Sequence, residues 1–363
     1  MKNYCLVSFC NIYVLPYAKT YIDEIIKSGN KCTLLFWDRD AVDGENDQYE
    51  GCEKICYQMK INPESTGVTK LVGYLKAARF FNRVLEKTDF EGIVFLQTHA
   101  AIMCKNILLK KFRNRYIVDI RDYTWENFAP YKWLEEKTMK EAYSVVISSP
   151  AYRKFLPKRE YIIAHNYTPF SEDVIREIRE SSERRQNSPV GISFVGTIRF
   201  LDMDKKILQL FKNDERFKIN YFGTGSDVLK TFAEDNHIDN VEFYGSFKPI
   251  MTTEFYKKTD LINNVYGNHD RFLDFALSNK LYHSGQFHIP ILVCPETYME
   301  EIALQYHMGF VLDVNDKESP DKLFKWFRQL DRQKLAKGCD SFIETVKLDN
   351  EKFTEMIICF LRK

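Results

Sequence analysis

Runs rich in β-branched and aromatic residues alternate with amphipathic stretches through the first 170 residues. The runs have the length of buried strands, and the apolar residues between them recur at helical spacing. Residues 16–27 place Tyr21, Ile22 and Ile25 on one helical face and stop before Gly29, and residues 69–87 repeat the pattern. The pattern predicts strands at residues 4–9, 31–37, 92–96, 116–119, 144–147 and 161–164.

The alternation stops in residues 171–189, which are almost all polar, and then restarts. A polar stretch between two periodic regions is typical of a linker. Beyond it the pattern predicts a second series of strands, with helices between them and a helical tail over residues 321–363. The strands are expected at residues 191–195, 217–222, 241–244, 261–265, 289–293 and 309–312.

Strands that alternate with helices predict parallel sheets, so the fold class is α/β with two Rossmann-like, doubly wound domains. We expect an N-terminal domain over residues 1–170, a linker over 171–189 and a C-terminal domain over 190–340. Residues 341–363 are expected to form a helix that packs back on the N-terminal domain. The acidic, aperiodic stretch of residues 38–63 is predicted to be a long loop above the strand ends.

Composition narrows the class of protein further. A length of 363 residues suits two domains, and 45% hydrophobic residues can fill their cores. The net charge of +1 argues against a nucleic-acid partner. The nine cysteines are scattered without disulfide or zinc spacing, and no apolar run is long enough for a signal peptide or a membrane span. We therefore expect a cytoplasmic globular protein.

Three strand ends in the second half carry residues that suit an anion. Gly196, Thr197 and Arg199 follow the first strand, and Gly223 and Gly225 follow the second. Ser278, Asn279 and Lys280 open a helix before a later strand. Glycine lets backbone N–H groups approach phosphate oxygens, and Arg or Lys neutralises the charge. Each signal alone is weak, because Gly-x-Gly also forms ordinary tight turns, but their order favours a nucleoside diphosphate.

The segment Asn279-Lys280-Leu281-Tyr282-His283-Ser284-Gly285-Gln286-Phe287-His288-Ile289-Pro290-Ile291-Leu292 resembles the donor-site signature of the retaining GT-B glycosyltransferases, the large family that contains group 1 type capsule and lipopolysaccharide sugar transferases. Residues 221–225 and 239–245 resemble the family's Gly-x-Gly and its base-reading turn, which implies that Phe243, Tyr244 and Gly245 lie near the nucleotide base. Residues 194–199 resemble its phosphate-binding strand end. In the first half, His99 stands where the family often has a histidine after a strand, and residues 117–122 resemble the next strand and acidic turn.

The sequence also departs from the family pattern. His283 stands where the family usually has a glutamate that contacts the donor, and His288-Ile289 replace the usual glycine before the proline. The second glutamate of the family motif is also missing, and Asp274 cannot restore it in register. Asp270, Arg271 and Asp274 are the candidates near the transferred sugar.

The resemblance implies a metal-independent, retaining transfer from a nucleotide sugar. Cleavage of the bond between the anomeric carbon and phosphate leaves negative charge on the diphosphate, so stabilising that group is the main catalytic task. We assign it to Arg199 and Lys280, with Lys205 and Lys206 as surface residues that could assist. His99 is assigned to the sugar or the acceptor hydroxyl, and Asp122 to orienting the acceptor.

Two Asp-x-Asp strings, Asp38-Arg39-Asp40 and Asp202-Met203-Asp204, keep a divalent metal open as a rival way to hold the diphosphate. Such strings arise by chance in a chain with 28% charged residues, so no cofactor and no metal are expected.

Basic and apolar residues mix in two segments of the first half, 74–83 and 108–115. Lys and Arg near an anionic membrane favour reversible attachment, although a solvated helix face over a core stripe accounts for the pattern equally well. Peripheral contact with the membrane would suit a glycan or lipid-linked oligosaccharide acceptor in the synthesis of capsule or another surface polysaccharide.

Three functions remain open at this point. The first is a hexosyltransferase that uses a nucleotide sugar. The second is a sugar-nucleotide epimerase on the same fold, which would need acid and base groups such as His99, Asp122 and His283. The third is a binding subunit without catalytic activity, for which the residue at His283 is the support.

Overall fold

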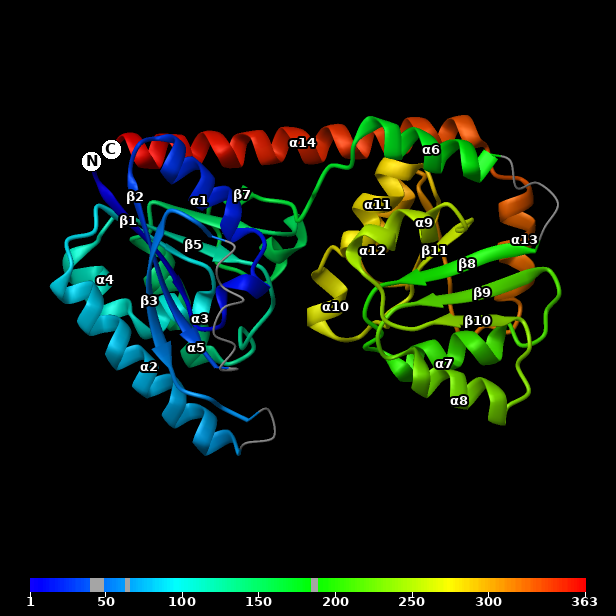
Figure 1. Cartoon of the computed structure of the whole chain (residues 1–363), viewed down its shortest axis with the longest axis horizontal. Helices are drawn as coiled ribbons and strands as arrows, with labels where there is room; N and C mark the ends of the chain where they lie inside the picture. Colours follow the sequence, from blue (N-terminus) through cyan, green and yellow to red (C-terminus); the bar gives the residue numbers. More distant parts are fainter. Residues whose placement is uncertain (40–48, 63–65, 184–188) are drawn as a thin grey trace. The chain divides into compact units, whose positions relative to one another are not determined.

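The computed structural model describes residues 1–39, 49–62, 66–183 and 189–363, and the chain divides into two units. The first unit comprises residues 1–165 and 348–363, and the second comprises residues 166–347. Each unit contains its own parallel sheet with helices on both faces, as the alternating pattern predicts. Figure 1 shows the two sheets and the helices around them.

The first unit holds a parallel sheet in the order β3-β2-β1-β4-β5-β6-β7. Strand β1 pairs with two neighbours, so that Asn3 lies beside Lys31 of β2 and Tyr4 lies beside Gly92 of β4. The doubly wound order places the connections after β1 and β4 at one edge of the sheet, where ligands bind in such folds. The strands are β1 (Asn3–Ser8), β2 (Lys31–Asp38), β3 (Cys52–Gln58), β4 (Gly92–Phe95), β5 (Tyr116–Ile120), β6 (Ser144–Ile147) and β7 (Ile162–Ile163).

Helices cover both faces of this sheet because successive side chains of each strand point to opposite sides. Tyr4 and Leu6 of β1 pack with α1 and with the chain's last turns, where Phe353 and Phe360 join the same core. Helix α2 buries Gly73, Ala77 and Phe81. The helices of this unit are α1 (Ala18–Lys27), α2 (Gly67–Lys87), α3 (Thr98–Met103), α4 (Lys105–Lys111) and α5 (Ala129–Lys140), with short 3-10 turns at η1 (Ile12–Val14) and η3 (Pro150–Lys154).

The prediction of a loop over residues 38–63 is wrong in part, because Cys52–Gln58 form β3. This strand pairs with β2 along its whole length, from Cys52 beside Cys32 to Gln58 beside Asp38. It lies at the edge of the sheet and its side chains are mostly exposed or half-buried, so it lacks the apolar run of a buried strand. Edge strands with charged residues are the ones that hydrophobic pattern identifies least well.

The second unit holds a parallel sheet in the order β10-β9-β8-β11-β12-β13. The strands fall within two residues of the predicted ones, and Val190 of β8 lies beside Phe217 of β9. They are β8 (Val190–Val195), β9 (Phe217–Phe222), β10 (Val241–Tyr244), β11 (Leu261–Asn264), β12 (Ile291–Val293) and β13 (Gly309–Val311).

Helices on the two faces of this sheet form separate cores. Helices α7 and α8 pack on one face, and α9 and α11 lie on the other (Figure 1). The helices of this unit are α6 (Glu172–Glu183), α7 (Leu201–Leu210), α8 (Ser226–Asp235), α9 (Thr252–Tyr256), α10 (Arg271–Phe275), α11 (Asn279–Phe287), α12 (Tyr298–Gln305) and α13 (Ser319–Arg328), with a 3-10 turn at η4 (Pro249–Met251). Helix α14 (Arg332–Arg362) contributes residues to both units.

The linker predicted over residues 171–189 is wrong where the structure describes it, because Glu172–Glu183 form α6. Its few apolar residues, Val174, Ile175 and Ile178, are spaced to share one helical face. Ile178 is fully buried and joins the core of the second unit, with the other two packed against it. The polar composition belongs to the outer face of a packed helix. Residues 184–188 lie outside the described residues.

Candidate functional site

Two glycine turns meet at the carboxyl ends of β8 and β9. The N–H of Gly196 donates to the carbonyl of Phe222 (2.8 Å), and the N–H of Ile198 donates to that of Thr224 (3.0 Å). The backbones approach so closely that a Cβ on Gly223 would lie 1.8 Å from the Gly196 oxygen. Gly223 also has a φ of +151°, which L side chains rarely adopt. Glycine is therefore required here by the contact between the turns as well as by their conformation.

Helix α11 begins beside these turns. The hydroxyl of Ser278 donates to the Asn264 side chain at the end of β11 (2.6 Å), which fixes the start of the helix to the carboxyl edge of the sheet. Asn279 is exposed at the first helical position. Lys280 follows it and turns inward, so that its Nζ lies 3.8 Å from the position a Cβ would take on Gly196. The predicted residues of three strand ends are thus brought together.

Aromatic rings surround the ammonium group of Lys280. Its Nζ lies 3.9 Å from the ring centroid of Phe194 and donates a hydrogen bond to the Tyr266 hydroxyl (2.6 Å). The side chain is 7% exposed. A cation over an aromatic face is attracted by the ring quadrupole, but the rings replace only part of its lost hydration.

The pKa of Lys280 is lowered to about 7, chiefly by burial, with Asp204 raising it and the nearby Arg199 guanidinium contributing to the decrease. Burial likewise raises the pKa of Asp204 to about 7, while a hydrogen bond from the Tyr221 hydroxyl (3.1 Å) and the charge of Lys280 favour its ionised form. Little negative charge compensates the ammonium group of Lys280 in the unliganded protein. The site therefore favours the binding of an anion. A phosphate oxygen at this place would restore the lost electrostatic stabilisation.

The remaining groups at this edge also suit an anion. Arg199 and Thr197 are exposed beside the buried lysine. Helices α8 and α11 both begin at the carboxyl edge, and the positive end of a helix dipole favours negative charge. Helix α8 starts after Gly225, whose φ of +93° admits the turn. The geometry can therefore bind a polyanion with two cations, helix N-termini and glycine backbones.

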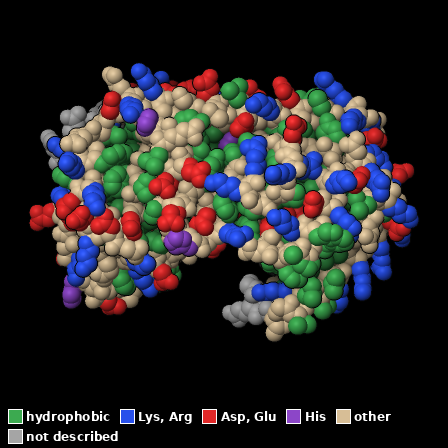
Figure 2. All heavy atoms as spheres, turned by 180° about the vertical axis from the view of Figure 1, so that it is seen from behind, with side chains coloured by type: hydrophobic (Ala, Val, Ile, Leu, Met, Phe, Trp, Pro, Cys, Tyr) green, Lys and Arg blue, Asp and Glu red, His purple; other side chains and the backbone are tan. Residues whose placement is uncertain are grey.

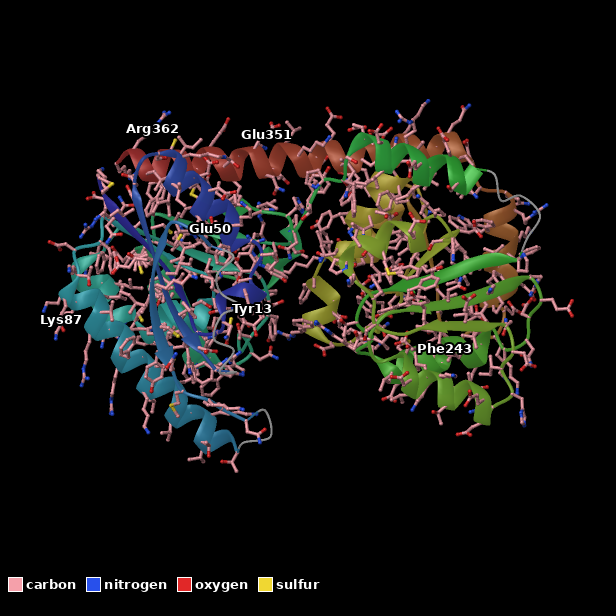
Figure 3. The ribbon with its side chains drawn as sticks, viewed as in Figure 1. Tyr13, Glu50, Lys87, Phe243, Glu351 and Arg362 are labelled. Atoms are coloured by element: carbon pink, nitrogen blue, oxygen red, sulfur yellow. The ribbon has the colours of Figure 1, made fainter. Side chains whose placement is uncertain are left out.

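The predicted base-reading residues divide between two environments. Phe243, labelled in Figure 3, stacks on Tyr221 with centroids 5.8 Å apart and belongs to the core beneath β10. Tyr244 is 42% exposed, and its carbonyl accepts a hydrogen bond from the Gly223 N–H (2.9 Å). Gly245 is open, with nothing within 4 Å of a Cβ placed on it. Tyr244 and Gly245 are therefore available to a base, while Phe243 supports the core because alternate strand residues point to opposite faces.

The three residues predicted to lie near the transferred sugar are in the segment between β11 and α11. Asp270 caps α10 by accepting a hydrogen bond from the Phe272 N–H (2.9 Å), and Arg271 is exposed. The Oδ1 atom of Asp274 is buried without a hydrogen-bond partner, and burial raises the pKa of this carboxyl group. Buried polar atoms normally have partners. Asp274 is half-buried, so its carboxyl group can accept a hydrogen bond from a ligand hydroxyl at this surface.

His283 is held by aromatic neighbours. Its Nδ1 lies 2.8 Å from the Tyr256 hydroxyl, and its ring lies edge to face with Phe170. Burial lowers the pKa of His283 to about 4, with a further contribution from Lys280. The side chain is therefore a neutral imidazole at physiological pH.

His288 ends α11 with a φ of +54°. A left-handed residue at a helix end is usually glycine, and here the imidazole is held by Asp340 (2.8 Å). His288 therefore adopts the left-handed conformation that glycine most often adopts at this position of a helix end.

His99 lies at the carboxyl end of β4 in the first unit, at the start of α3. Its ring packs edge to face against Phe9 and Tyr74, with centroids 5.9 and 5.7 Å apart. Burial and the charge of Arg39 lower the pKa of His99 to about 4. The imidazole is neutral and could exchange a hydrogen bond with a hydroxyl, without acting as a cation.

Asp122 is exposed in the turn after β5. The residues just before it form a buried ion pair, in which the Arg121 Nε donates to Asp119 (2.6 Å), and the guanidinium lies 4.2 Å from the Tyr17 ring centroid. Asp119 also accepts a hydrogen bond from Tyr21 (2.8 Å). This network holds the turn and leaves Asp122 at its surface.

The two Asp-x-Asp strings do not present paired carboxylates among the described residues. Asp202 is exposed, whereas Asp204 is buried against Tyr221. Asp38 accepts a hydrogen bond from Asn11, and Asp40 lies outside the described residues. In the part of the chain that the structure describes, no group of three His, Cys, Asp or Glu could hold a metal ion.

Lys205 and Lys206 lie on α7, along an outer groove of about 450 Å³ that Leu210 and Phe232 also line. The Nζ of Lys205 is 5.5 Å from the ring centroid of Phe232. Lys205 is partly exposed and Lys206 is exposed, so both are surface residues on the outer side of α7.

Sequence reasoning missed the residues that tune Lys280, namely Tyr266 and Asp204, and did not assign a separate role to Phe194. Tyr266 follows the strand predicted at 261–265, so its place at a strand end was a usable signal. Asp204 was considered only as half of a metal motif. Its burial follows from the face of α7 that packs on the sheet, which a two-residue spacing does not reveal.

No protein-family model and no curated protein sequence matches the chain. Solved structures do match it over nearly its whole length. Sucrose-phosphate synthase from Thermosynechococcus elongatus aligns with a TM-score of 0.72 at 10% identity, covering 100% of this chain and 98% of that one. Anabaena Alr3699/HepE in complex with UDP aligns at 0.68 and 11% identity, covering 98% and 99%. The lipopolysaccharide outer core galactosyltransferase WaaB, in its apo form, aligns at 0.68 and 10% identity, covering 98% and 99%.

None of the helices in the described part of the chain has the length and apolar character that a membrane crossing needs. At identities of 10 to 11%, the shared feature is the arrangement of two parallel-sheet domains in one chain. The protein has the GT-B fold, with two Rossmann-like domains, as the sequence predicts.

Proposed function

We propose that this protein is a glycosyltransferase that moves a sugar from a nucleoside diphosphate to a glycan acceptor. The observation that carries the proposal is the buried ammonium group of Lys280 against the Gly196 turn, at a strand edge where Arg199 and two helix N-termini also lie. Such a site favours the charge that develops on a leaving diphosphate. UDP and UDP-glucose complexes of Anabaena HepE, which has the same fold, support a nucleotide sugar as the ligand.

Each group has a role in this scheme. Lys280 and Arg199 bind the diphosphate and stabilise it as the bond to the anomeric carbon breaks. The half-buried carboxyl group of Asp274 accepts a hydrogen bond from the transferred sugar. Tyr244 and Gly245 contact the base at the open edge of β10. In the first unit, neutral His99 binds a hydroxyl of the sugar or acceptor, and Asp122 orients the acceptor.

We further propose that transfer proceeds with retention. We also propose that it needs no metal ion, because the cations and backbone groups already present can neutralise the diphosphate. The acceptor is proposed to be a glycan on a lipid carrier, of the kind used in capsule or other surface polysaccharide synthesis. These features follow from the resemblance of residues 279–292 to the retaining family.

Nucleotide binding is tested by thermal unfolding of the purified protein with UDP, GDP, ADP, CMP and dTDP, each with and without EDTA. A ligand at about 100 times its Kd stabilises the native state by about 2.7 kcal/mol. We expect one nucleoside diphosphate to stabilise the protein equally with and without EDTA. A stabilisation that EDTA abolishes would overturn the metal-free scheme, and the absence of any response would count against the donor site.

The sugar contact is tested with Asp274→Asn against the matched change Asp235→Asn, at an exposed carboxyl group on the last residue of α8. We expect D274N to weaken binding of the nucleotide sugar by about tenfold while leaving binding of the nucleoside diphosphate unchanged. An equal loss of affinity for both ligands would show that Asp274 does not contact the sugar. Analysis of the products then distinguishes transfer from epimerisation, because only transfer releases the nucleoside diphosphate.

A further inference from the structure

Helix α2 of the first unit is apolar on two opposite faces. Gly73, Ala77 and Phe81 face the sheet and are buried. On the other side, four apolar residues follow at positions i, i+3, i+4 and i+7: Val68, Leu71, Val72 and Leu75, with 72%, 58%, 42% and 47% of their surface exposed. The outer face of a helix that covers a sheet is normally polar. We call this stripe the α2 outer stripe, and among the described residues it is not part of the buried core of the unit.

Basic residues continue the same face toward the end of the helix. Lys76, Arg79 and Arg83 are exposed in the turns that follow the α2 outer stripe. Over its whole length α2 carries five Lys or Arg residues and one acidic residue. Lys87, labelled in Figure 3, marks the far end. The outer face of α2 therefore changes from apolar to cationic along its axis.

The neighbouring helices extend this surface. Helix α4 packs beside α2, and α5 beside α4. Trp133 of α5 is 53% exposed and lies between two ammonium groups, with Lys137 at 3.7 Å and Lys105 of α4 at 5.7 Å from its ring centroid. Exposed tryptophan flanked by lysine is favoured at the boundary between lipid and water. Figure 2 shows hydrophobic and basic side chains gathered together at the lower right, with few acidic ones among them.

We propose that this surface docks on an anionic lipid bilayer. The α2 outer stripe enters the boundary between headgroups and acyl chains, while Lys76, Arg79 and Arg83 contact lipid phosphates. The charge favours lipid over a second copy of the chain, because a two-fold interface through α2 would bring like charges together. Trp133 anchors the α5 side of the same surface.

The structure changes which residues carry the membrane hypothesis of the sequence. In the segment 108–115, Leu108 and Phe112 are fully buried. Lys111 donates to the carbonyls of Leu85, Glu86 and Thr88 and so caps the end of α2. This segment positions the docking helix, and the exposed face of α2 provides the contact.

Docking would give the enzyme access to an acceptor on a lipid carrier, and this purpose rests on the proposed function. The docking itself does not depend on donor binding. Failure of the docking proposal can therefore be distinguished from failure of the proposed function. Vesicle binding is measured without nucleotide, and nucleotide binding is measured without vesicles.

The test is flotation of the full-length protein with vesicles of phosphatidylcholine alone or mixed with phosphatidylglycerol. We expect binding to the mixed vesicles, weakened by salt, and little binding to phosphatidylcholine. Replacing two stripe residues, Leu71→Ser with Leu75→Ser, should reduce partition at least about tenfold, because each inserted leucine contributes roughly that factor. Replacing Arg79→Gln and Arg83→Gln should reduce it roughly fivefold per residue at low salt.

The matched control is Leu304→Ser, since Leu304 of α12 in the second unit is also 50% exposed. This variant should bind vesicles like the unchanged protein. All variants should keep the same thermal unfolding temperature, since the replaced side chains are exposed. Failure of the unchanged protein to bind mixed vesicles, or equal binding by L71S/L75S, would overturn the proposal. A self-association that L71S/L75S abolishes, without vesicle binding, would assign the surface to a second copy instead.

Discussion

The side-chain nitrogen of Lys280 lies 3.9 Å from the ring centroid of Phe194, in a position that is almost closed to water. The carboxylate that raises its pKa, Asp204, is itself buried and has a raised pKa. A charged lysine is costly in such a place without a bound anion. The lysine is therefore better suited to a ligand than to the unliganded protein.

Replacing Lys280 with methionine should stabilise the unliganded protein and abolish nucleotide binding. The pKa of Lys280 is lowered from 10.5 to about 7 in the folded state. The free-energy cost of burying the charged lysine is therefore fully present below pH 7. This cost disappears as pH rises toward 10.5. We expect K280M to gain about 1–3 kcal/mol at pH 6 and less at pH 10, measured by urea unfolding. Lys206→Met, an exposed change on α7, should alter neither quantity, and a destabilised K280M would contradict this account.

Nucleotide affinity should fall as pH rises above about 7. The bound diphosphate requires the protonated lysine, so binding above the pKa of Lys280 must take up a proton. The slope approaches about tenfold in Kd per pH unit until the pKa of the complex is reached. Titration calorimetry in buffers with different ionisation enthalpies would detect the proton. Lys280→Arg, which keeps its charge throughout, should remove the slope, and an unchanged slope in that variant would assign it to another group.

The contact between the two glycine turns predicts a sharp difference between two glycines of the second unit. A Cβ on Gly223 would lie 1.8 Å from the Gly196 oxygen, at a φ of +151°, so Gly223→Ala must force the turns apart. We expect a loss of about 2 kcal/mol or more in the free energy of unfolding, together with loss of nucleotide stabilisation. Gly245→Ala, at an open position, should cost less than about 0.5 kcal/mol. Similar losses for both would mean that the turns tolerate separation.

The first unit contains a carboxyl group whose ionisation should destabilise the fold. Both carboxylate oxygens of Glu135 are buried without hydrogen-bond partners, and burial, with the charge of Glu126, raises its pKa to about 8. Stability should therefore fall as pH rises from about 4.5 to about 8, by up to about 5 kcal/mol. Glu135→Gln should flatten this dependence, measured by thermal or urea unfolding across the range. Glu136→Gln, its exposed neighbour, should leave the dependence intact; a flat profile in the unchanged protein would argue that Glu135 finds a partner.

The alternation of apolar and polar residues is enough to predict the fold class and most of the strands. Buried parallel strands are near-continuous apolar runs, so residues 191–195 and 217–222 could be recognised without knowing their neighbours. Edge strand β3 and helix α6 escaped because few of their residues are buried, and their exposed residues dominate the pattern. The glycines and Lys280 at the strand ends were also predictable, since the carboxyl edge of a parallel sheet is where its connections meet.

Tertiary packing sets the role of each candidate residue. It joined Gly196, Gly223 and Lys280, which are far apart in the chain, and it surrounded the lysine with Phe194, Tyr266 and Asp204. It also gave two adjacent residues different environments, since Phe243 packs against the core and Tyr244 is exposed. Sequence patterns report which residues favour a strand or a helix, whereas burial and the pKa of a group depend on neighbours that packing brings together. The charge state of Lys280, on which the proposed chemistry depends, is a property of that packing.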